Sequence, residues 1–274
     1  MEQPLISCIM PTKNRREFVA QALYYFEKQD YPNKELIVVD DGDDLVVDLV
    51  SSHPQVRYLA PQYAHTVGVK RNIACEAAYG EIICHWDDDD WYAPTRLSYQ
   101  VAPLLAGEAD VTGLHLQFVL DICHMRGWHC ADIPTTFAGV EGMHYGTAMY
   151  RKHLWATRSR FRDSVEGDDG SGFVRRLINS GAVVQTMPCR TQHIYVRHGR
   201  NIWKYRPGTS IGSEIWTQSN PERFLSQEDL YFYNEKNVQM RQKTYTAPTL
   251  PVLEKRARGL LTKKVVPFVL SFKR

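Results

Sequence analysis

Short apolar runs alternate with segments of helical periodicity over the first third of the chain, and this alternation constrains the fold more than any other feature. The runs that read as strands are 5–10, 35–39, 55–60 and 81–86. Between them, residues 15–28, 44–51 and 68–79 carry apolar side chains at helical spacing. Strands that alternate with helices form a mainly parallel sheet that is covered on both faces. We therefore expect an α/β fold with a Rossmann-like, mainly parallel sheet flanked by helices.

Polar clusters follow three of these strands directly. They are PTKNR at 11–15, DDGDD at 40–44 and DDDD at 87–90. Ligands of an open parallel sheet bind beyond the carboxyl ends of its strands. We therefore expect the three clusters to converge on one edge of the sheet and to form the binding site there.

The second half of the chain is less regular, but no linker or repeat separates it from the first. The patterns there favour helices at 94–106 and 172–179 and strands at 109–120, 143–150, 182–187 and 192–197. We expect a single domain over residues 1–235, with 1–107 and 108–235 as its two halves. A C-terminal extension, 236–274, follows it.

The positive charge of the chain is concentrated in its last residues. The formal net charge is +2, and residues 252–274 carry seven Lys or Arg and one acid, so the rest of the chain has four more acids than bases. A nucleic-acid-binding protein usually carries its basic residues on the folded body, often as a stripe. We therefore expect no nucleic-acid partner.

Neither the apolar runs nor the cysteines indicate export or membrane insertion. No run approaches the roughly 20 apolar residues of a membrane-spanning helix, and the first residues lack the basic-then-apolar pattern of a secretory signal. The six cysteines are scattered without the spacing of a disulfide framework. We expect reduced thiols and a cytoplasmic chain.

The strongest chemical signal is the acidic run Asp87–Asp90, because Trp86 and Trp91 bracket it. Four adjacent carboxylates repel one another, and a surface made only for solubility does not need two tryptophans beside them. A divalent cation relieves the repulsion. Carboxylate oxygens suit Mg²⁺ and Mn²⁺, which complete their coordination with water and ligand phosphates. We expect Mn²⁺ or Mg²⁺ as the cofactor, and the alternative is an exposed acidic loop.

Four segments together resemble a known family. They are PTKNR (11–15), ELIVVDDG (35–42), an Arg-Asn pair at 71–72 and the acidic run at 87–90. In this order and at this spacing they resemble the nucleotide-sugar half of glycosyltransferase family 2, whose members have the GT-A fold and a DXD motif. The resemblance covers residues 5–96.

The resemblance assigns donor contacts to particular positions. It implies that Asp41 accepts a hydrogen bond from the base of a uridine-type nucleotide, and that Arg71 and Asn72 lie near the nucleotide. Lys13 stands where relatives often have an aromatic residue that stacks on the base, and a lysine could reach a phosphate instead. The nucleotide-sugar residues implied in this way are Pro11, Thr12, Lys13, Asn14, Arg15, Asp41, Arg71, Asn72, Asp87, Asp88, Arg197 and Arg200.

The same resemblance assigns Asp87 and Asp89 to the ribose and the metal. Asp90 is a competing metal ligand, because a run of four acids leaves the register open. Residues 193–205 resemble a late segment of the family that closes over the diphosphate, which makes His198 a third metal ligand or a phosphate contact. The alternative is that His198 is a structural residue and not a ligand, as a lone histidine often is. The diphosphate contacts implied beside it are Arg197, Arg200 and Lys204.

A candidate base comes from residues 161–177, which resemble the family segment where a carboxylate opens a helix. Asp169 stands six residues before Arg175, which is the family's spacing, and Asp168 replaces the usual Glu. Acids also favour helix N-termini through capping and the macrodipole, so both have an ordinary explanation. The resemblance implies Asp169 as the catalytic base, with Asp168 as the alternative.

Together these assignments imply a metal-dependent hexosyltransferase. A sugar would move from a nucleotide-diphosphate donor of the UDP-linked type to an acceptor hydroxyl with inversion, because one base and one metal site suit an inverting transferase better than a two-carboxylate hydrolase. One alternative is a nucleotidyltransferase on the same type of sheet, although PTKNRR lacks the glycine-rich loop of such enzymes. The other is a noncatalytic nucleotide- or carbohydrate-binding relative.

The basic extension has two readings. Residues 252–266 place apolar side chains on one stripe of a helix, with most of the Lys and Arg outside it, and 268–272 add a second apolar patch. Such a segment binds an anionic membrane surface, which would make the protein peripheral at the inner face of a membrane. The simpler reading is a terminal helix that docks on the acidic body.

Overall fold

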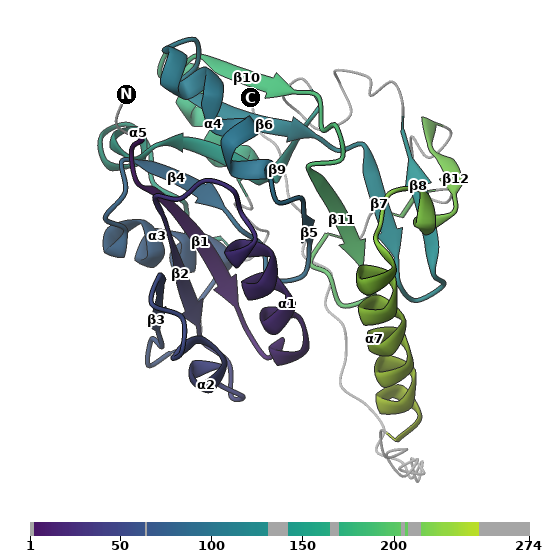
Figure 1. Cartoon of the computed structure of the whole chain (residues 1–274). Helices are drawn as coiled ribbons and strands as arrows, with labels where there is room; N and C mark the ends of the chain where they lie inside the picture. Colours follow the sequence, from purple (N-terminus) through teal and green to yellow (C-terminus); the bar gives the residue numbers. More distant parts are fainter. Residues whose placement is uncertain are drawn as a thin grey trace, which may run out of the picture.

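The computed structural model describes residues 3–63, 65–130, 142–164, 170–203, 206–207 and 215–246, with side chains up to residue 236. The helices are α1 (Arg16–Glu27), α2 (Val47–Val50), α3 (Val67–Ala77), α4 (Arg96–Ala106), α5 (Lys152–Thr157), α6 (Ser171–Asn179) and α7 (Gln227–Thr246), with the 3₁₀ helix η2 (Pro221–Arg223). The strands are β1 (Ile6–Thr12), β2 (Lys34–Asp40), β3 (Val56–Leu59), β4 (Ile82–His85), β5 (Trp91–Tyr92), β6 (Val111–His115), β7 (Phe118–Asp121), β8 (Arg126–His129), β9 (Met143–Arg151), β10 (Val184–Met187), β11 (His193–Arg197) and β12 (Thr217–Ser219). They form two sheets (Figure 1).

The larger sheet has seven strands in the order β10-β6-β9-β4-β1-β2-β3. β1 pairs in parallel with both β2 and β4, and the pairs β2–β3 and β6–β10 are parallel as well. β9 runs antiparallel to both of its neighbours, β4 and β6. The prediction of a mainly parallel α/β sheet is confirmed, with β9 as the antiparallel strand.

Helices cover both faces of this sheet, as the alternation predicts. On one face, Val19 and Phe26 of α1 and Leu97 of α4 belong to a core cluster with residues of β1 and β4. On the other face, Ala74 of α3 and Phe173 of α6 pack against the same strands. Because β1, β2 and β4 are buried on both sides, their sequences are continuous apolar runs instead of alternating patterns.

The second sheet, which the sequence does not predict, has the order β12-β8-β7-β11-β5. The single strand expected at 109–120 is two strands, β6 and β7, and these belong to different sheets. Between them, the carbonyl of Gln117 accepts a hydrogen bond from Cys130 N at 3.0 Å, and its Oε1 accepts one from Cys189 N at 2.8 Å. The break is not visible in the sequence, since both strands are apolar.

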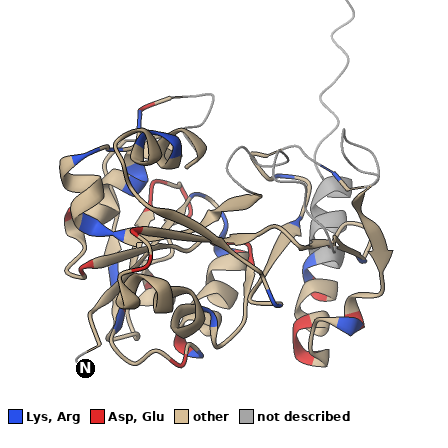
Figure 2. Ribbon diagram, turned by 90° about the horizontal axis from the view of Figure 1, so that it is seen from above, with Lys and Arg blue, Asp and Glu red and all other residues tan. Residues whose placement is uncertain are grey.

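The long helix α7 lies beside the smaller sheet in both views (Figures 1 and 2). Ser226 caps it, because its Oγ accepts a hydrogen bond from Asp229 N at 3.1 Å. Figure 2 shows the acidic residues of its first turn, where negative charge is favourable. Leu230 and Tyr233 attach the helix to the apolar cluster of β7 and β11.

The boundary that we expected at residue 235 falls inside α7. The basic segment 252–274 lies outside the described residues, so both readings of it stay predictions. In the part of the chain that the structure describes, no helix has the length and apolar character needed to cross a membrane.

Candidate active site

The polar clusters meet at the carboxyl ends of β1, β2 and β4, as the sequence predicts. Pro11 is the penultimate residue of β1, and Thr12 Oγ1 donates a hydrogen bond to Asp88 Oδ2 at 2.6 Å. Arg15 Nη1 contacts Asp88 Oδ1 at 2.8 Å and Asp89 Oδ2 at 2.6 Å. The cluster after β1 therefore neutralises two carboxylates of the cluster after β4.

Asn14 joins the cluster after β1 to the cluster after β2. Its Oδ1 accepts hydrogen bonds from the backbone N–H groups of Asp43 and Asp44, at 2.7 and 3.2 Å. Asn14 has a φ of 53°, in the left-handed region that Asn tolerates better than most residues. A Cβ on Gly42 would lie 2.5 Å from Asn14 Oδ1, so the two loops can touch only with glycine at that position.

The four carboxylates of the acidic run have different surroundings. Asp87 pairs with Arg71 at 3.3 Å, and its side chain is 24% exposed. The side chains of Asp88, Asp89 and Asp90 are 2%, 8% and 1% exposed. Arginines of the protein itself thus relieve part of the repulsion, and Asp87 is the carboxylate of the run that faces solvent most.

Asp89 lies at the centre of a second group of contacts. Its Oδ2, which already contacts Arg15, lies 2.8 Å from His198 Nε2 and 3.5 Å from Asn201 Nδ2. Asn201 Oδ1 also accepts a hydrogen bond from His198 N at 2.9 Å. The late segment that the sequence places at the site therefore contacts the acidic run.

Burial governs the acidity of these groups. It raises the pKa of Asp87 to about 6, raises that of Asp88, and raises that of Asp90 well above its ordinary value. Burial acts on Asp89 in the same direction, but the charge of Arg15 and the hydrogen bond with the nearby imidazole outweigh it and lower the pKa. Asp89 is therefore the carboxylate whose negative charge the protein stabilises.

By the chemistry of their donor atoms, Asp87, Asp89 and His198 are candidate ligands of a divalent cation. Two carboxylates and one imidazole nitrogen are a ligand set that Mn²⁺ accepts, and the exposed carboxylate leaves room for ligand phosphates. His198 Nδ1 is buried and has no hydrogen-bond partner among the described residues. Asp90 has other partners: its Oδ1 accepts a hydrogen bond from a backbone N–H of β11 at 2.9 Å, and its Oδ2 lies 2.8 Å from His193 Nε2.

Asp41, the predicted contact of the base, is a buried side chain with partners of its own. It has no exposed surface, forms an ion pair with Lys70 at 2.8 Å and accepts a hydrogen bond from His65 N at 2.6 Å. Lys70 Nζ also donates to Thr12 O at 2.9 Å. A contact between Asp41 and a nucleotide base therefore requires these partners to move. Sequence reasoning missed Lys70, although it stands directly before the Arg-Asn pair.

Arg71 and Asn72 of α3 reach different parts of the molecule. Arg71 points to the acidic run, as described above. Asn72 Oδ1 accepts hydrogen bonds from Trp155 Nε1 at 2.9 Å and Phe161 N at 3.1 Å, and its Nδ2 donates to Phe161 O at 2.9 Å. Asn72 thus fixes the chain that leads toward α6, and its contact with a nucleotide stays a prediction.

The remaining predicted donor residues lie around the edge of the site. Lys13 is exposed. Arg197 is buried and donates to a backbone carbonyl, whereas Arg200, 51% exposed, pairs with Glu17 of α1. Lys204 lies outside the described residues.

The two candidate bases, Asp168 and Asp169, also lie outside the described residues. Gly170 follows them in the sequence and has a φ of 117°. A Cβ built on Gly170 would lie 3.7 Å from Arg71 Nη1. The chain directly after the candidate bases is therefore beside the arginine that pairs with Asp87.

Arg96 is a fully buried residue of this region that sequence reasoning missed. Its Nη2 donates to His85 O at 2.9 Å and to Thr147 O at 3.3 Å, and its guanidinium lies 4.4 Å from the centre of the Tyr92 ring. It holds the end of β4 just before the acidic run begins. In the sequence it is one arginine at the start of a predicted helix, which gives no sign of burial.

We expect Arg96→Met to lower the free energy of unfolding by about 2–4 kcal/mol, because two buried carbonyls lose a charged donor. Methionine fills a similar volume but cannot donate. Denaturant unfolding followed by circular dichroism measures the change. Arg158→Met, which removes an exposed arginine that also donates to a carbonyl, is the matched control. A loss no larger than that of the control would contradict the role assigned to Arg96.

Gly146 of β9 packs against the acidic run. A Cβ there would lie 2.6 Å from Asp87 Oδ2 and 3.0 Å from His144 Cε1. We expect Gly146→Ala to push the Asp87 carboxylate out of its rotamer, at a cost of about 0.5–1.5 kcal/mol, and to weaken metal-dependent nucleotide binding about 2- to 10-fold. Calorimetric titration measures it. Gly107→Ala, whose added methyl meets no atom within 4 Å, should leave the nucleotide affinity unchanged.

Comparisons with known proteins find relatives of the first half of the chain. Residues 7–129 match the family Glycosyl transferase family 2. Over 108 residues the chain is 31% identical to WfgD of Escherichia coli, named a UDP-Glc:α-D-GlcNAc-diphosphoundecaprenol β-1,3-glucosyltransferase. That match covers 38% of this chain and 43% of the relative, so the chain spans less than half of the relative's length.

Two solved structures share the fold. Staphylococcus aureus TarS 1–349 in complex with UDP-GlcNAc has a TM-score of 0.59 at 17% identity, over 72% of this chain and 60% of that one. The mannosyltransferase PcManGT of Pyrobaculum calidifontis, in complex with GDP-Man and Mn²⁺, has a TM-score of 0.56 at 20% identity, over 73% and 59%. At these identities the likeness is one of fold. Residues 7–129 are therefore similar to glycosyltransferase family 2, and the chain has the GT-A fold.

Proposed function

We propose that the chain transfers a hexosyl group from a UDP-linked sugar to an acceptor hydroxyl, with inversion at the anomeric carbon and with Mn²⁺ or Mg²⁺ at the acidic run. The observation that carries the proposal is the meeting of Asp87–Asp90 with Arg15, Arg71 and His198. In an α/β sheet of this kind, the carboxyl edge is where ligands bind.

The donor side of the proposal rests on charge and exposure. A divalent cation held by Asp87 and Asp89 would neutralise the charge that develops on the leaving diphosphate. Asp87 is exposed enough to meet a ligand from solvent, and Asp89 has the lowered pKa of a group that stays ionised. Lys13 and Arg200 are exposed cations of the predicted phosphate set.

The acceptor side needs one group that takes the proton of the attacking hydroxyl. We assign this role to Asp169. The support is its place in the sequence directly before Gly170, which lies beside Arg71 and hence beside the proposed donor position. Since the diphosphate leaves with its charge neutralised, no second protein acid is needed.

The acceptor that we propose is a glycan carried on a lipid diphosphate, by likeness to the acceptor that WfgD's name gives. Residues 252–274 would then bind the protein to the anionic inner face of a membrane. Sedimentation with vesicles tests this: the full-length chain should pellet with anionic and not with neutral vesicles at low salt. A truncated chain that ends near residue 251 should stay in solution and remain folded. If the full-length protein does not bind anionic vesicles, the alternative holds, in which the segment is a terminal helix that docks on the acidic body.

A panel of nucleotide sugars tests the proposed reaction. We expect UDP-hexoses, with Mn²⁺ or Mg²⁺ present, to raise the melting temperature, and EDTA to abolish the rise. Product analysis then separates the alternatives. UDP release that depends on an acceptor supports transfer, whereas release into water without an acceptor indicates a hydrolase. Pyrophosphate release indicates a nucleotidyltransferase, and binding without turnover indicates a noncatalytic relative.

A further inference from the structure

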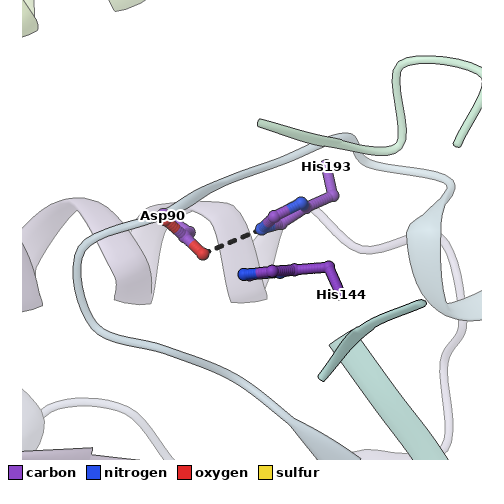
Figure 3. Close-up of side chains that lie close together, drawn as sticks. All are labelled: Asp90, His144 and His193. Atoms are coloured by element: carbon purple, nitrogen blue, oxygen red, sulfur yellow. Dashed lines mark hydrogen bonds and ion pairs between the residues drawn. The ribbon is translucent and has the colours of Figure 1, made fainter. Parts of the chain in front are cut away.

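We propose that Asp90, His144 and His193 form a second metal site, which takes a divalent transition-metal ion of the Zn²⁺ class and links the two sheets. One ligand atom of each side chain lies within 4.8 Å of the other two. Figure 3 shows a nitrogen of each ring pointing toward the Asp90 carboxylate. The proposed sugar transfer gives these two histidines no task, so this site goes beyond it.

The three residues come from three different elements. Asp90 immediately precedes β5, His144 lies in β9, and His193 begins β11. β9 belongs to the larger sheet, whereas β5 and β11 pair with each other in the smaller one. An ion shared by the three side chains would therefore cross-link the sheets. The Asp90–His193 contact alone joins only elements of the smaller sheet.

The geometry is close to that of a bound ion. Asp90 Oδ2 lies 2.8 Å from His193 Nε2, and the His144 ring stacks on the His193 ring with centroids 4.9 Å apart and planes 25° apart. In a tetrahedral Zn²⁺ site with bonds of about 2.0–2.1 Å, the ligand atoms lie about 3.3 Å from one another. Small rotations of the rings therefore bring the three atoms into position.

The state of the imidazoles is the one that binds metals. Burial lowers the pKa of His144 to about 4 and lowers that of His193 well below its ordinary value, so both rings are neutral near pH 7. Their Nδ1 atoms are buried and have no hydrogen-bond partner among the described residues. His193 faces Asp90 with its other ring nitrogen, Nε2, which is the atom that would bind an ion.

This site is separate from the proposed donor position. The side chains of Asp90 and His193 are each 1% exposed, so these two ligands shield an ion from solvent, and His144 is half-buried. Asp89 turns instead to Arg15 and His198. Two imidazoles and one carboxylate suit Zn²⁺ better than Mg²⁺, which prefers oxygen ligands. The ion would have three protein ligands and water as its fourth.

Zn²⁺ binding to untagged full-length protein tests the proposal. The background variant is Asp89→Asn, which removes a ligand of the donor position and leaves the second site intact. After the protein is stripped with a chelator, Zn²⁺ is titrated against a chromophoric competitor. We expect one Zn²⁺ per chain, and an affinity about 100-fold weaker or more when His144→Asn is added. His153→Asn, an exposed histidine of α5, is the matched control and should change nothing.

Two outcomes would overturn the proposal: no Zn²⁺ bound by the background variant, or equal binding with and without His144→Asn. Circular dichroism and melting show whether each variant is folded. If His144→Asn unfolds the protein, the electron spin echo spectrum of Cu²⁺ decides, measured in the background variant with His198→Asn added so that the donor position supplies no imidazole. The spectrum detects imidazole nitrogens, and only oxygen ligands would contradict the site. The UDP-hexose experiment uses unmodified protein, so failure of the proposed transfer is distinguishable from failure of this site.

Discussion

Asp87→Asn should weaken Mn²⁺-dependent binding of a UDP-hexose by about 100-fold or more, because it removes an anionic ligand, and even outer contacts of metal ligands contribute about 10- to 100-fold. The melting temperature should stay the same or rise. The fold does not rely on this charge, since burial raises the pKa of Asp87 to about 6 and so disfavours its ionised form. Calorimetric titration and thermal unfolding measure the two quantities separately.

Asp89→Asn should cause a similar loss of binding but should also lower the melting temperature. Arg15 and His198 stabilise the charge of Asp89, so the folded protein loses their interaction with it. Asp30→Asn is the matched control, because Asp30 is exposed and precedes β2, at the edge of the sheet opposite the site. If the double variant Asp87→Asn/Asp89→Asn bound a UDP-hexose with full affinity in the presence of EDTA, the metal mechanism would be contradicted.

Asp169→Asn should reduce sugar transfer roughly 10²- to 10⁴-fold, which is the usual contribution of a general base. Asparagine keeps the size of the side chain but cannot accept the proton of the acceptor hydroxyl. The affinity for the donor should be unchanged, since the diphosphate and the metal do not need this group. An assay of acceptor-dependent UDP release measures the rate, and calorimetric titration measures the donor affinity.

Asp168→Asn is the natural control, because it makes the same change of charge one residue away. If Asp168→Asn keeps full activity and Asp169→Asn is inactive, Asp169 is the base, as proposed here. The opposite pattern would assign the base to Asp168, and two fully active variants would exclude this segment from catalysis.

The larger sheet and its binding edge were predictable because they depend on local sequence. β1, β2 and β4 are buried on both faces, which produces continuous apolar runs, and α1 and α3 follow with helical periodicity. Parallel strands place their carboxyl ends at one edge, so the convergence of the polar clusters follows from the order of elements alone.

The smaller sheet and the partners of the acidic run were not predictable, because they depend on pairings between distant segments. β5 has only two residues, and its partner β11 begins about 100 residues later. The sequence of the acidic run does not show that the Asp90 side chain contacts His193 and not the partners of the neighbouring acids. The role of Arg15 was hidden in the same way: its motif was visible, but the carboxylates that it neutralises were not.

The contacts of the acidic run Asp87–Asp90 become possible at different times during synthesis, because their partners lie at distant positions in the chain. Arg15 and Arg71 precede the acidic run, so its first counter-charges are already made when Asp87–Asp90 leaves the ribosome. The histidine partners of Asp90 and Asp89 follow 103 and 109 residues later, which is about 5–20 s of translation. A nascent chain that stops before β11 therefore lacks both contacts of the Asp90 carboxylate, and Asp89 and Asp90 gain their histidine hydrogen bonds only after residue 198 has been made.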